Sequence, residues 1–300
     1  MRVNPNMVPN ILADMQQSQS AVNTALQQVA SGKRVTVPSD DPAASADMVQ
    51  NTVETANVDQ YTKNVSSMLS MVQTADSTLG NVVTSLTQAV TLGTEGANGT
   101  NNSSNLQSIA TQVQGIIKSV VAQANTSYQG TYLFGGTETT TAPYTASSSS
   151  SSGYTYNGNS SVNSVAVGDD LNVDVNVPGD QIFSNSSADV LGSLSTLVTA
   201  LQSGDSTAIG NATTAVNAAL SNVSQQRVLY GNAETQLNSQ ETYLQKETVN
   251  LTSQQSSLVD VDEAQAATEL SQAETANSAA AAAAAKVLPV TLLNYLSSPQ

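Results

Sequence analysis

The feature that most constrains the fold is a seven-residue apolar repeat along two long stretches of the chain. Between residues 223 and 258 an apolar side chain recurs at every seventh position, at Val223, Tyr230, Leu237, Leu244, Leu251 and Leu258. Between residues 61 and 89 the apolar positions alternate steps of four and three, at Tyr61, Val65, Met68, Val72, Ala75, Leu79, Val82, Leu86 and Ala89. Such persistence is typical of long helices that pack along a narrow seam, so the sequence predicts a coiled-coil-like bundle.

A first helix is predicted over residues 12–31, where apolar residues keep helical spacing. It should end at Gly32, with Lys33 and Arg34 beside the negative end of its dipole. We also expect Pro5 and Pro9 to delay its start.

The segment from Ser39 to Pro42 has the signals of a helix start. An Asp side chain there can cap the next helix, and proline fits the first helical position. A continuous helix from Pro42 to Leu92 would be about 75 Å long. Turn residues between Gly93 and Asn105 then separate it from another helical stretch, so we expect an antiparallel helical hairpin.

Signals of β structure replace the helical periodicity between residues 131 and 186. Tyr154–Tyr156 precedes Asn157-Gly158, a dipeptide favoured in tight hairpin turns, and residues 171–177 alternate as in a half-buried strand. Five aromatic residues gather in this region, which favours the core of a small β domain over a sugar-binding surface: Tyr132, Phe134, Tyr144, Tyr154 and Tyr156.

The order of these elements predicts an α+β fold, in which the N- and C-terminal segments form a long helical bundle with a small inserted β domain. Both termini should lie at the same end of it. Because isolated helices are marginal in water, roughly the first 40 and last 40 residues are expected to order only on assembly. The predicted segments are an N-terminal helix of an inner domain (1–42), outgoing rod helices (43–130), the β domain (131–186), returning rod helices (187–260) and a C-terminal inner helix (261–300).

Composition excludes several classes of function. The chain has 8 basic and 23 acidic residues, a net charge of -15, and neither Cys nor His. Binding to nucleic acid or to an anionic membrane surface requires clustered basic residues, and here they are scattered. Without thiols and imidazoles, the commonest nucleophiles, bases and zinc ligands are missing. We therefore expect no enzymatic activity, no cofactor and no metal.

The acidic residues do not form a convincing catalytic or metal site. Asp40 and Asp41 are adjacent and should point apart in a turn, unlike the facing carboxylates of glycosidases. The aspartates between Asp169 and Asp180 have no EF-hand spacing. The alternation of the predicted strand explains them better, as a solvated face.

The two ends of the chain do not look like membrane segments. The first nine residues have no apolar core or cleavage site of a secretory signal peptide. The apolar tract Ala279–Leu296 is interrupted by Lys286, Pro289 and Asn294, which makes it a poor membrane span. An apolar end needs a cover to stay soluble, so a partner surface is expected there.

The segment Ser31-Gly32-Lys33-Arg34, followed by Pro38–Ala44, resembles the N-terminal signature of flagellin-like proteins. Within that superfamily, Asp41-Pro42 is similar to the hook-associated protein 3 group, whereas flagellins tend to carry Asp-Asp-Ala-Ala-Gly. Arg227, Gly231 and Leu237 resemble the returning-helix motif of both groups, and residues 131–137 resemble the entry into the β domain. The signature and cap residues are Gly32, Arg34, Ser39, Asp40, Asp41 and Pro42.

The resemblance implies a structural subunit of the bacterial flagellum that joins the hook, through the first hook-associated protein, to the flagellin filament. It also implies unfolded export through the flagellar type III apparatus with a dedicated chaperone, an extracellular location, and self-assembly into a ring or helical layer. Two alternatives stay open: a flagellin filament subunit, and a secreted translocator-like protein of a type III system. The residues predicted to pair the terminal helices and polymerise are Leu12, Met15, Val22, Leu26, Val29, Leu270, Ala273, Leu288, Leu292, Leu293 and Leu296.

Overall fold

The computed structural model describes residues 7–296 of the chain, with side chains for residues 9–286. It contains two compact units. Unit 1 combines the chain up to Asn57 with the chain from Glu247 onward, and unit 2 is Val58–Lys246. Helices α2 (Pro42–Gly96) and α6 (Ser206–Val259) contribute residues to both units. The division into five segments drawn from the sequence stays a prediction.

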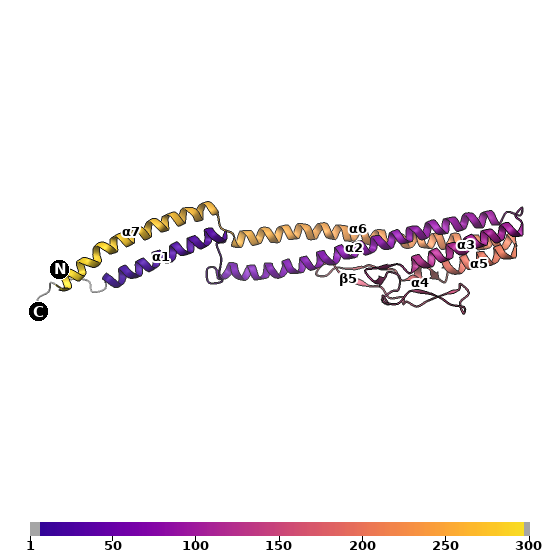
Figure 1. Ribbon diagram of the computed structural model, residues 1–300, viewed down its shortest axis with the longest axis horizontal. Coiled ribbons are helices and arrows are strands. Elements are labelled where there is room, and N and C mark those ends of the chain that lie inside the picture. Colours follow the sequence, from indigo (N-terminus) through magenta and orange to yellow (C-terminus); the bar gives the residue numbers. More distant parts are fainter. Residues whose placement is uncertain (1–6, 297–300) are drawn as a thin grey trace. The chain divides into compact units, whose positions relative to one another are not determined.

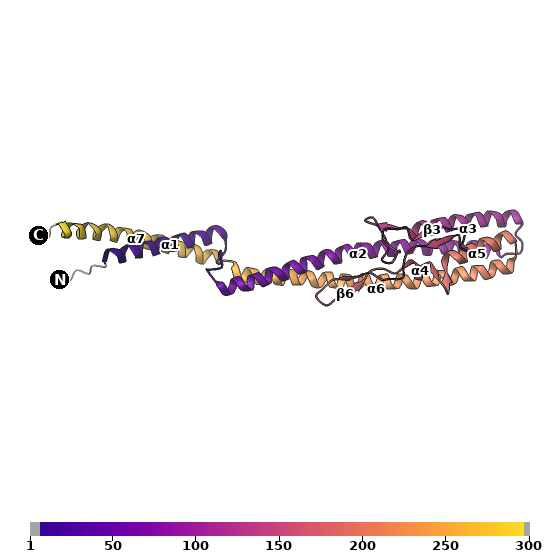
Figure 2. The same ribbon diagram turned by 90° about the horizontal axis from the view of Figure 1, so that it is seen from below.

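Unit 1 is built on two antiparallel helices, α1 (Met7–Ser31) and α7 (Glu263–Leu296), which lie side by side (Figures 1 and 2). The Asn277 amide donates a hydrogen bond to Gln19 Oε1 at 3.1 Å near the middle of the pair. The start of α1 and the end of α7 therefore lie at the same end of the pair, as expected. Pro9 does not delay α1 as predicted, because it falls in the first helical turn, where backbone N–H groups have no helical partner. Pro5 lies outside the described residues.

The shared face of α1 and α7 follows a coiled-coil repeat. The less exposed residues of α1 are Ile11, Met15, Ser18, Val22 and Ala25, together with Gln28. Those of α7 recur in steps of four and three, at Ala266, Leu270, Ala273, Asn277, Ala280 and Ala284. Since most of the α7 positions are alanine, the seam is narrow and contains few large apolar side chains.

Unit 2 is organised around the paired seams of α2 and α6, with α3 (Ser103–Ala124) and α5 (Val190–Ser203) packed beside their ends. The seven-residue repeat is confirmed, because Val65, Val72, Leu79, Val223 and Leu237 are all fully buried. Polar residues alternate with this repeat along α6 and remain partly exposed or exposed: Arg227, Glu234, Glu241, Thr248 and Gln255. The 55 residues of α2 correspond to a length of about 82 Å at about 1.5 Å per residue.

The turn between α2 and α3 begins later than predicted. Helix α2 continues through Gly93 to Gly96, although glycine is a poor helix former. A Cβ at Gly93 would collide with Thr213, and a Cβ at Gly96 with Leu201. These glycines therefore serve close helix packing instead of chain reversal.

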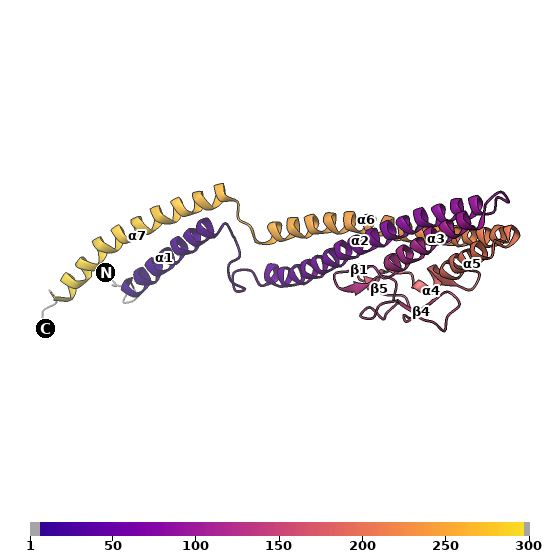
Figure 3. The same cartoon turned by 45° about the vertical axis from the view of Figure 1, so that its right-hand side comes forward.

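The β region consists of four small antiparallel pairs of strands, which lie beside the helices of unit 2 (Figure 3). The short helix α4 (Gly179–Ile182) precedes the last pair. Of the half-buried strand predicted over residues 171–177, only Asn172–Asp174 forms a regular strand. The predicted inward-facing residues Val173, Val175 and Val177 are buried. The pairs are β1 (Ser127–Tyr128) with β2 (Thr131–Tyr132), β3 (Tyr144–Ala146) with β4 (Tyr154–Tyr156), β5 (Ser164–Ala166) with β6 (Asn172–Asp174), and β7 (Ser184–Asn185) with β8 (Ala188–Asp189).

The predicted hairpin turn at Asn157-Gly158 is wrong. Strands β3 and β4 are joined by the serine-rich loop before Tyr154, which closes where the Ser147 amide donates to the Gly153 carbonyl at 2.9 Å. Gly153 has φ +77°, a conformation that glycine adopts without strain. Asn157 instead extends the pairing of the two strands, because its amide donates to the Pro143 carbonyl at 2.8 Å.

Aromatic side chains form the core of the β region, as expected. Phe134 and Phe183 are fully buried, with ring centroids 5.5 Å apart in an edge-to-face arrangement. Tyr144 is 2% exposed and donates its hydroxyl hydrogen to the Gly179 carbonyl at 2.8 Å. Burial raises the pKa of the Tyr144 hydroxyl well above its usual range. Tyr132, Tyr154 and Tyr156 are half-buried around this core.

Candidate assembly site

The predicted signature residues lie in the connector, which we define as residues 32–41 together with residues 260–262. Gly32 ends α1 with φ +69°, and its amide donates to the Gln28 carbonyl at 2.9 Å. The Gly32 carbonyl accepts from the Val261 amide at 3.1 Å, and Lys33 forms an antiparallel bridge with Asp260. The connector is therefore made of two strands of chain more than 200 residues apart in the sequence.

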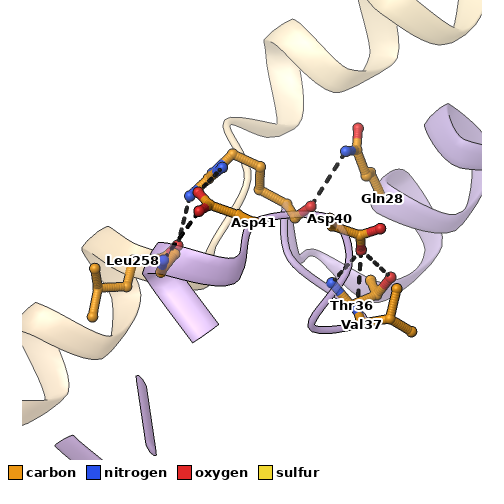
Figure 4. Close-up of polar contacts among 8 residues, drawn as sticks. Gln28, Thr36, Val37, Asp40, Asp41 and Leu258 are labelled. Carbon is orange, nitrogen blue, oxygen red and sulfur yellow. Dashed lines mark hydrogen bonds and ion pairs between the residues drawn. The ribbon is translucent and has the colours of Figure 1, made fainter. Parts of the chain in front are cut away.

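Arg34 fastens the connector to the end of α6. Its guanidinium donates to the Asp41 carboxylate at 3.0 Å and to the Leu258 carbonyl at 2.9 Å (Figure 4). The Arg34 amide also donates to the Val259 carbonyl at 2.7 Å. Lys33 and Arg34 follow Gly32, just after the end of α1 at Ser31, and their predicted role beside the negative end of its dipole stays a prediction. Arg34 satisfies a free carbonyl at the negative end of α6.

Asp40 organises the turn that precedes α2. One carboxylate oxygen accepts from the amides of Thr36 and Val37 and from the Thr36 hydroxyl, each at 3.0 Å (Figure 4). The hydrogen bonds from the Val37 amide, followed by those from Thr36, lower the pKa of the Asp40 carboxyl. Asp40 therefore shapes the turn and does not cap the helix, and the neighbouring Ser39 is exposed on it.

Asp41 caps α2, as predicted. Its carboxylate accepts from the Ala44 amide at 3.0 Å, and Pro42 occupies the first helical position. The hydrogen bond from the Ala44 amide, followed by that from Arg34, lowers the pKa of the Asp41 carboxyl. The Asp41 side chain thus caps the start of α2 and also binds Arg34, which satisfies a carbonyl at the end of α6.

The predicted polymerisation residues divide into two groups. Met15, Val22, Leu270 and Ala273 are half-buried at the spacing of the shared face of α1 and α7. The other three predicted residues of α1 are more exposed, Leu12 by 57%, Leu26 by 53% and Val29 by 40%, so α7 leaves much of each side chain uncovered. We call these three residues the exposed apolar stripe of α1. The side chains of Leu288, Leu292, Leu293 and Leu296 lie outside the part of the chain whose side chains are described.

Sequence reasoning missed the partner of Arg227. The Arg227 guanidinium makes a bidentate ion pair with Asp76, with nitrogen–oxygen distances of 2.9 and 2.8 Å. Asp76 directly follows Ala75 in the seam of α2 and could have been found as the acidic residue closest to that buried face. The ion pair connects α2 to α6 beside their dry seam.

Two of the aspartates considered for calcium have protein partners. Asp169 accepts from the Tyr61 hydroxyl at 3.1 Å, and Asp180 from the Ser160 hydroxyl. Within residues 7–296, no group of three or more potential metal ligands occurs. In the same range, no helix is long and apolar enough to cross a membrane.

Comparison with known proteins gives two matches at the family level. The profile of the bacterial flagellin N-terminal helical region matches residues 3–139, and that of the C-terminal helical region matches residues 213–296. Together these profiles cover more than half of the chain. They include the whole connector and the paired seams of α2 and α6.

Individual relatives point the same way. The chain is 34% identical to flagellar hook-associated protein 3 of Escherichia coli strain K12 over 119 residues, which are 39% of this chain and 38% of that relative. It is 31% identical to flagellin of Salmonella muenchen over 100 residues, 33% of this chain and 20% of that relative. The matched segments thus span well under two thirds of these relatives' lengths.

Among solved structures, that of Bacillus cereus FlgL has a TM-score of 0.60 and 25% identity, with 69% of this chain and 99% of that chain covered. The α+β fold with long terminal helices and a small β region is therefore confirmed. The resemblance to flagellin-like proteins, which rested on the connector residues, is confirmed as well. This chain belongs to the bacterial flagellin family.

Proposed function

We propose that this protein is a structural subunit of the bacterial flagellum that joins the hook to the flagellin filament by polymerising through its terminal helices. The observation that carries the proposal is the exposed apolar stripe of α1, formed by Leu12, Leu26 and Val29. Three large apolar side chains are exposed on a helix whose only charged residue is Asp14, which favours their burial against another surface. Burying one leucine stabilises an interface by about 1.5 to 3 kcal/mol.

The distribution of charge supports assembly through the same helices. Between Met7 and Ser31 the only charged residue is Asp14, although the whole chain has a net charge of -15. Copies with this charge repel one another at long range. Contacts between copies are therefore most favourable along surfaces such as α1 that contribute little to the repulsion.

The junction role is favoured over that of a filament subunit by the start of α2. Asp41 caps the helix and Pro42 begins it, the Asp-Asp-Pro pattern that resembles the hook-associated protein 3 group. A relative with that name matches a slightly longer segment at higher identity than the flagellin relative does. Flagellin itself is the second candidate function, because the C-terminal profile and the seam of α6 suit both groups.

The finer parts of the proposal concern export and partners. The protein would leave the cell unfolded through the flagellar type III apparatus, escorted by a chaperone, and bind the first hook-associated protein on one side and flagellin on the other. It would have no enzymatic role. A chain with no Cys suits passage through a narrow channel, because no thiols can cross-link it.

A clean deletion in the source bacterium tests the proposal. We expect hooks without filaments by electron microscopy, and flagellin lost to the culture medium by immunoblotting. Filaments of normal number on the deletion strain would reject the junction role. Loss of the filament protein itself from both cells and medium would identify the chain as flagellin.

A further inference from the structure

The sequence contains two Asn-Gly dipeptides, Asn98-Gly99 and Asn157-Gly158, and neither takes part in the proposed assembly. Asparagine before glycine is chemically labile, because glycine has no side chain to keep its backbone nitrogen away from the asparagine side chain. Both asparagines are exposed, so access to water does not distinguish them. The contacts around each dipeptide therefore decide whether it can react.

Asn98-Gly99 lies in the turn between α2 and α3. The Asn98 side-chain oxygen accepts two hydrogen bonds from Thr100, one from its amide at 3.3 Å and one from its hydroxyl at 3.1 Å. Asparagine often forms such a turn with the backbone two residues further on. Because the oxygen is held over Thr100, the side-chain carbon Cγ is held beside the backbone nitrogen of the intervening Gly99.

The atoms that would react in this turn are not restrained by other contacts. The Gly99 amide and the Asn98 side-chain nitrogen donate no hydrogen bond to any described residue. No atom lies within 4 Å of the position that a Cβ on Gly99 would take. The Gly99 nitrogen can therefore approach Cγ, and the side-chain nitrogen can leave it.

Asn157-Gly158 is held in place on each of these points. The Asn157 side-chain amide donates to the Thr145 hydroxyl at 2.9 Å, and its backbone amide donates to the Pro143 carbonyl at 2.8 Å. A Cβ at Gly158 would collide with the Tyr156 hydroxyl, so the backbone there has little room to rotate. The fold thus treats two identical dipeptides in opposite ways.

We propose that Asn98 is a site of spontaneous deamidation, in which the Gly99 nitrogen attacks the Asn98 side chain while Thr100 stabilises the oxygen that becomes negative. Donors that already point at such an oxygen lower the barrier to attack. The Gly99 nitrogen loses its proton to hydroxide and bonds to Cγ. The bond from Cγ to the side-chain nitrogen breaks, and that nitrogen takes up a proton and leaves as ammonia.

Water then opens the cyclic imide at one of its two carbonyl groups, which gives aspartate or isoaspartate at position 98. One water is consumed, one ammonia is released, and nothing is oxidised or reduced. Because the reaction needs no enzyme, the modified fraction grows with the age of the molecule. Asn157 stays unmodified in the folded chain.

The product changes the turn that follows α2. It carries one more negative charge, two residues after α2 ends at Gly96, and a carboxylate is unfavourable at the negative end of a helix dipole. Isoaspartate also lengthens the main chain, which displaces the Asn98 carbonyl that accepts from the Asn101 amide at 3.1 Å. The turn should therefore loosen with age, while the seams of unit 2 stay packed.

Peptide mass spectrometry of the full-length chain tests the proposal at both dipeptides in one sample. The chain is incubated in mildly alkaline buffer, either folded or unfolded in urea. Both asparagines should convert at similar rates in urea. In the folded chain, Asn98 should convert at least as fast as in urea and Asn157 at least tenfold more slowly, because a misplaced nucleophile reacts far less readily.

Two results would overturn the proposal. Equal conversion of Asn98 and Asn157 in the folded chain would mean that the dipeptide alone sets the rate. Conversion of Asn98 only after unfolding would mean that the turn protects this residue.

Substitutions at Thr100 test the part assigned to its hydroxyl. Thr100→Val keeps the shape of the side chain but removes the donor, and should slow conversion of Asn98 about tenfold, less than a lost donor costs in a site closed to water. Thr100→Ser keeps the hydroxyl and should retain most of the rate. Conversion of Asn98 at one rate in both variants would show that the hydroxyl does not stabilise the reacting oxygen.

Discussion

At the scale of single residues, Arg34 is the side chain that ties the connector to both long helices. It binds Asp41, the cap of α2, and the Leu258 carbonyl at the end of α6. The Arg34 side chain is 46% exposed, so solvent screening weakens its ion pair with Asp41. Its role is therefore to hold two chain segments in register.

We expect Arg34→Ala to open the connector locally while leaving unit 2 unchanged. Hydrogen exchange of the Val261 amide, which donates to Gly32, should quicken about tenfold, because the hydrogen bonds of Arg34 to Asp41 and to the Leu258 carbonyl are both lost. Arg34→Lys should recover only part of the protection, since an ammonium does not reproduce the guanidinium fork. Unchanged protection in Arg34→Ala would show that the backbone alone holds the connector.

Acid should open the same region. The pKa values of Asp40 and Asp41 are lowered by hydrogen bonds from backbone amides. A lowered native pKa means that the carboxylates stabilise the fold above the unfolded value of about 3.9 and cease to do so as the pH falls through the native pKa. We therefore expect protection of the connector to be constant near neutral pH and to fall below about pH 4.

Limited proteolysis with pepsin at pH 3 and hydrogen exchange at pH 6 measure this dependence. Asp40→Asn should open the turn already at pH 6, because an amide oxygen accepts the Thr36 and Val37 hydrogen bonds more weakly than a carboxylate. Asp59→Asn, an exposed change on α2, is the control. Identical behaviour of the two variants would assign the acid sensitivity to other groups.

At the scale of elements, sequence periodicity predicted the long helices well, because each seam position repeats the same local requirement. Val65, Val72 and Leu79 could be placed in the core without knowledge of their partners. The short strands could not be placed in this way. The loop between β5 and β6 is held by side chains of the helices: Tyr61 donates to Asp169, and Gln240 donates to the Val167 carbonyl at 2.8 Å.

In the candidate site, too, the sequence predicted local features but not contacts between distant segments. The Asp41 cap follows from local sequence, whereas the Leu258 partner of Arg34 lies 224 residues away. Likewise, helical spacing identified the apolar residues of α1 but not the orientation of the helix. Because Ala25 lies on the shared face of α1 and α7, the adjacent Leu26 points outward. The predicted face placed Leu26 inward, so at this point it differs from the observed face by one residue along the helix.

This orientation predicts opposite effects for two neighbouring aspartate substitutions. Leu26→Asp should leave the stability of the monomer within about 0.5 kcal/mol, because the side chain is largely exposed, yet it should abolish motility. Ala25→Asp should instead weaken the pairing of α1 with α7, since it places a charge at a residue that is only 6% exposed. Circular dichroism of the monomer and swimming assays of the complemented strain measure both. Normal motility with Leu26→Asp would show that the exposed apolar stripe is not an interface.

At the scale of the whole molecule, the two units differ in how much apolar core they contain. The largest fully buried side chains, among them Phe134, Phe183 and Leu237, all lie in unit 2. The seam of α1 and α7 contains mainly alanine, and the Ser18 hydroxyl within it is buried without a hydrogen-bond partner among the described residues. Unit 2 can therefore fold by its own packing, whereas the terminal pair depends on additional contacts.

We accordingly expect the terminal helices to be ordered stably only in the assembled state. In a dilute monomer, amides of α1 and α7 should exchange at least a hundredfold faster than those of α6 around Leu237, because helices without enough apolar burial are marginal in water. In sheared flagella the same amides of α1 and α7 should become protected as neighbours cover Leu12, Leu26 and Val29. Slow exchange throughout α1 in the dilute monomer would show that the pair is stable alone, and assembly would then join preformed helices instead of folding them.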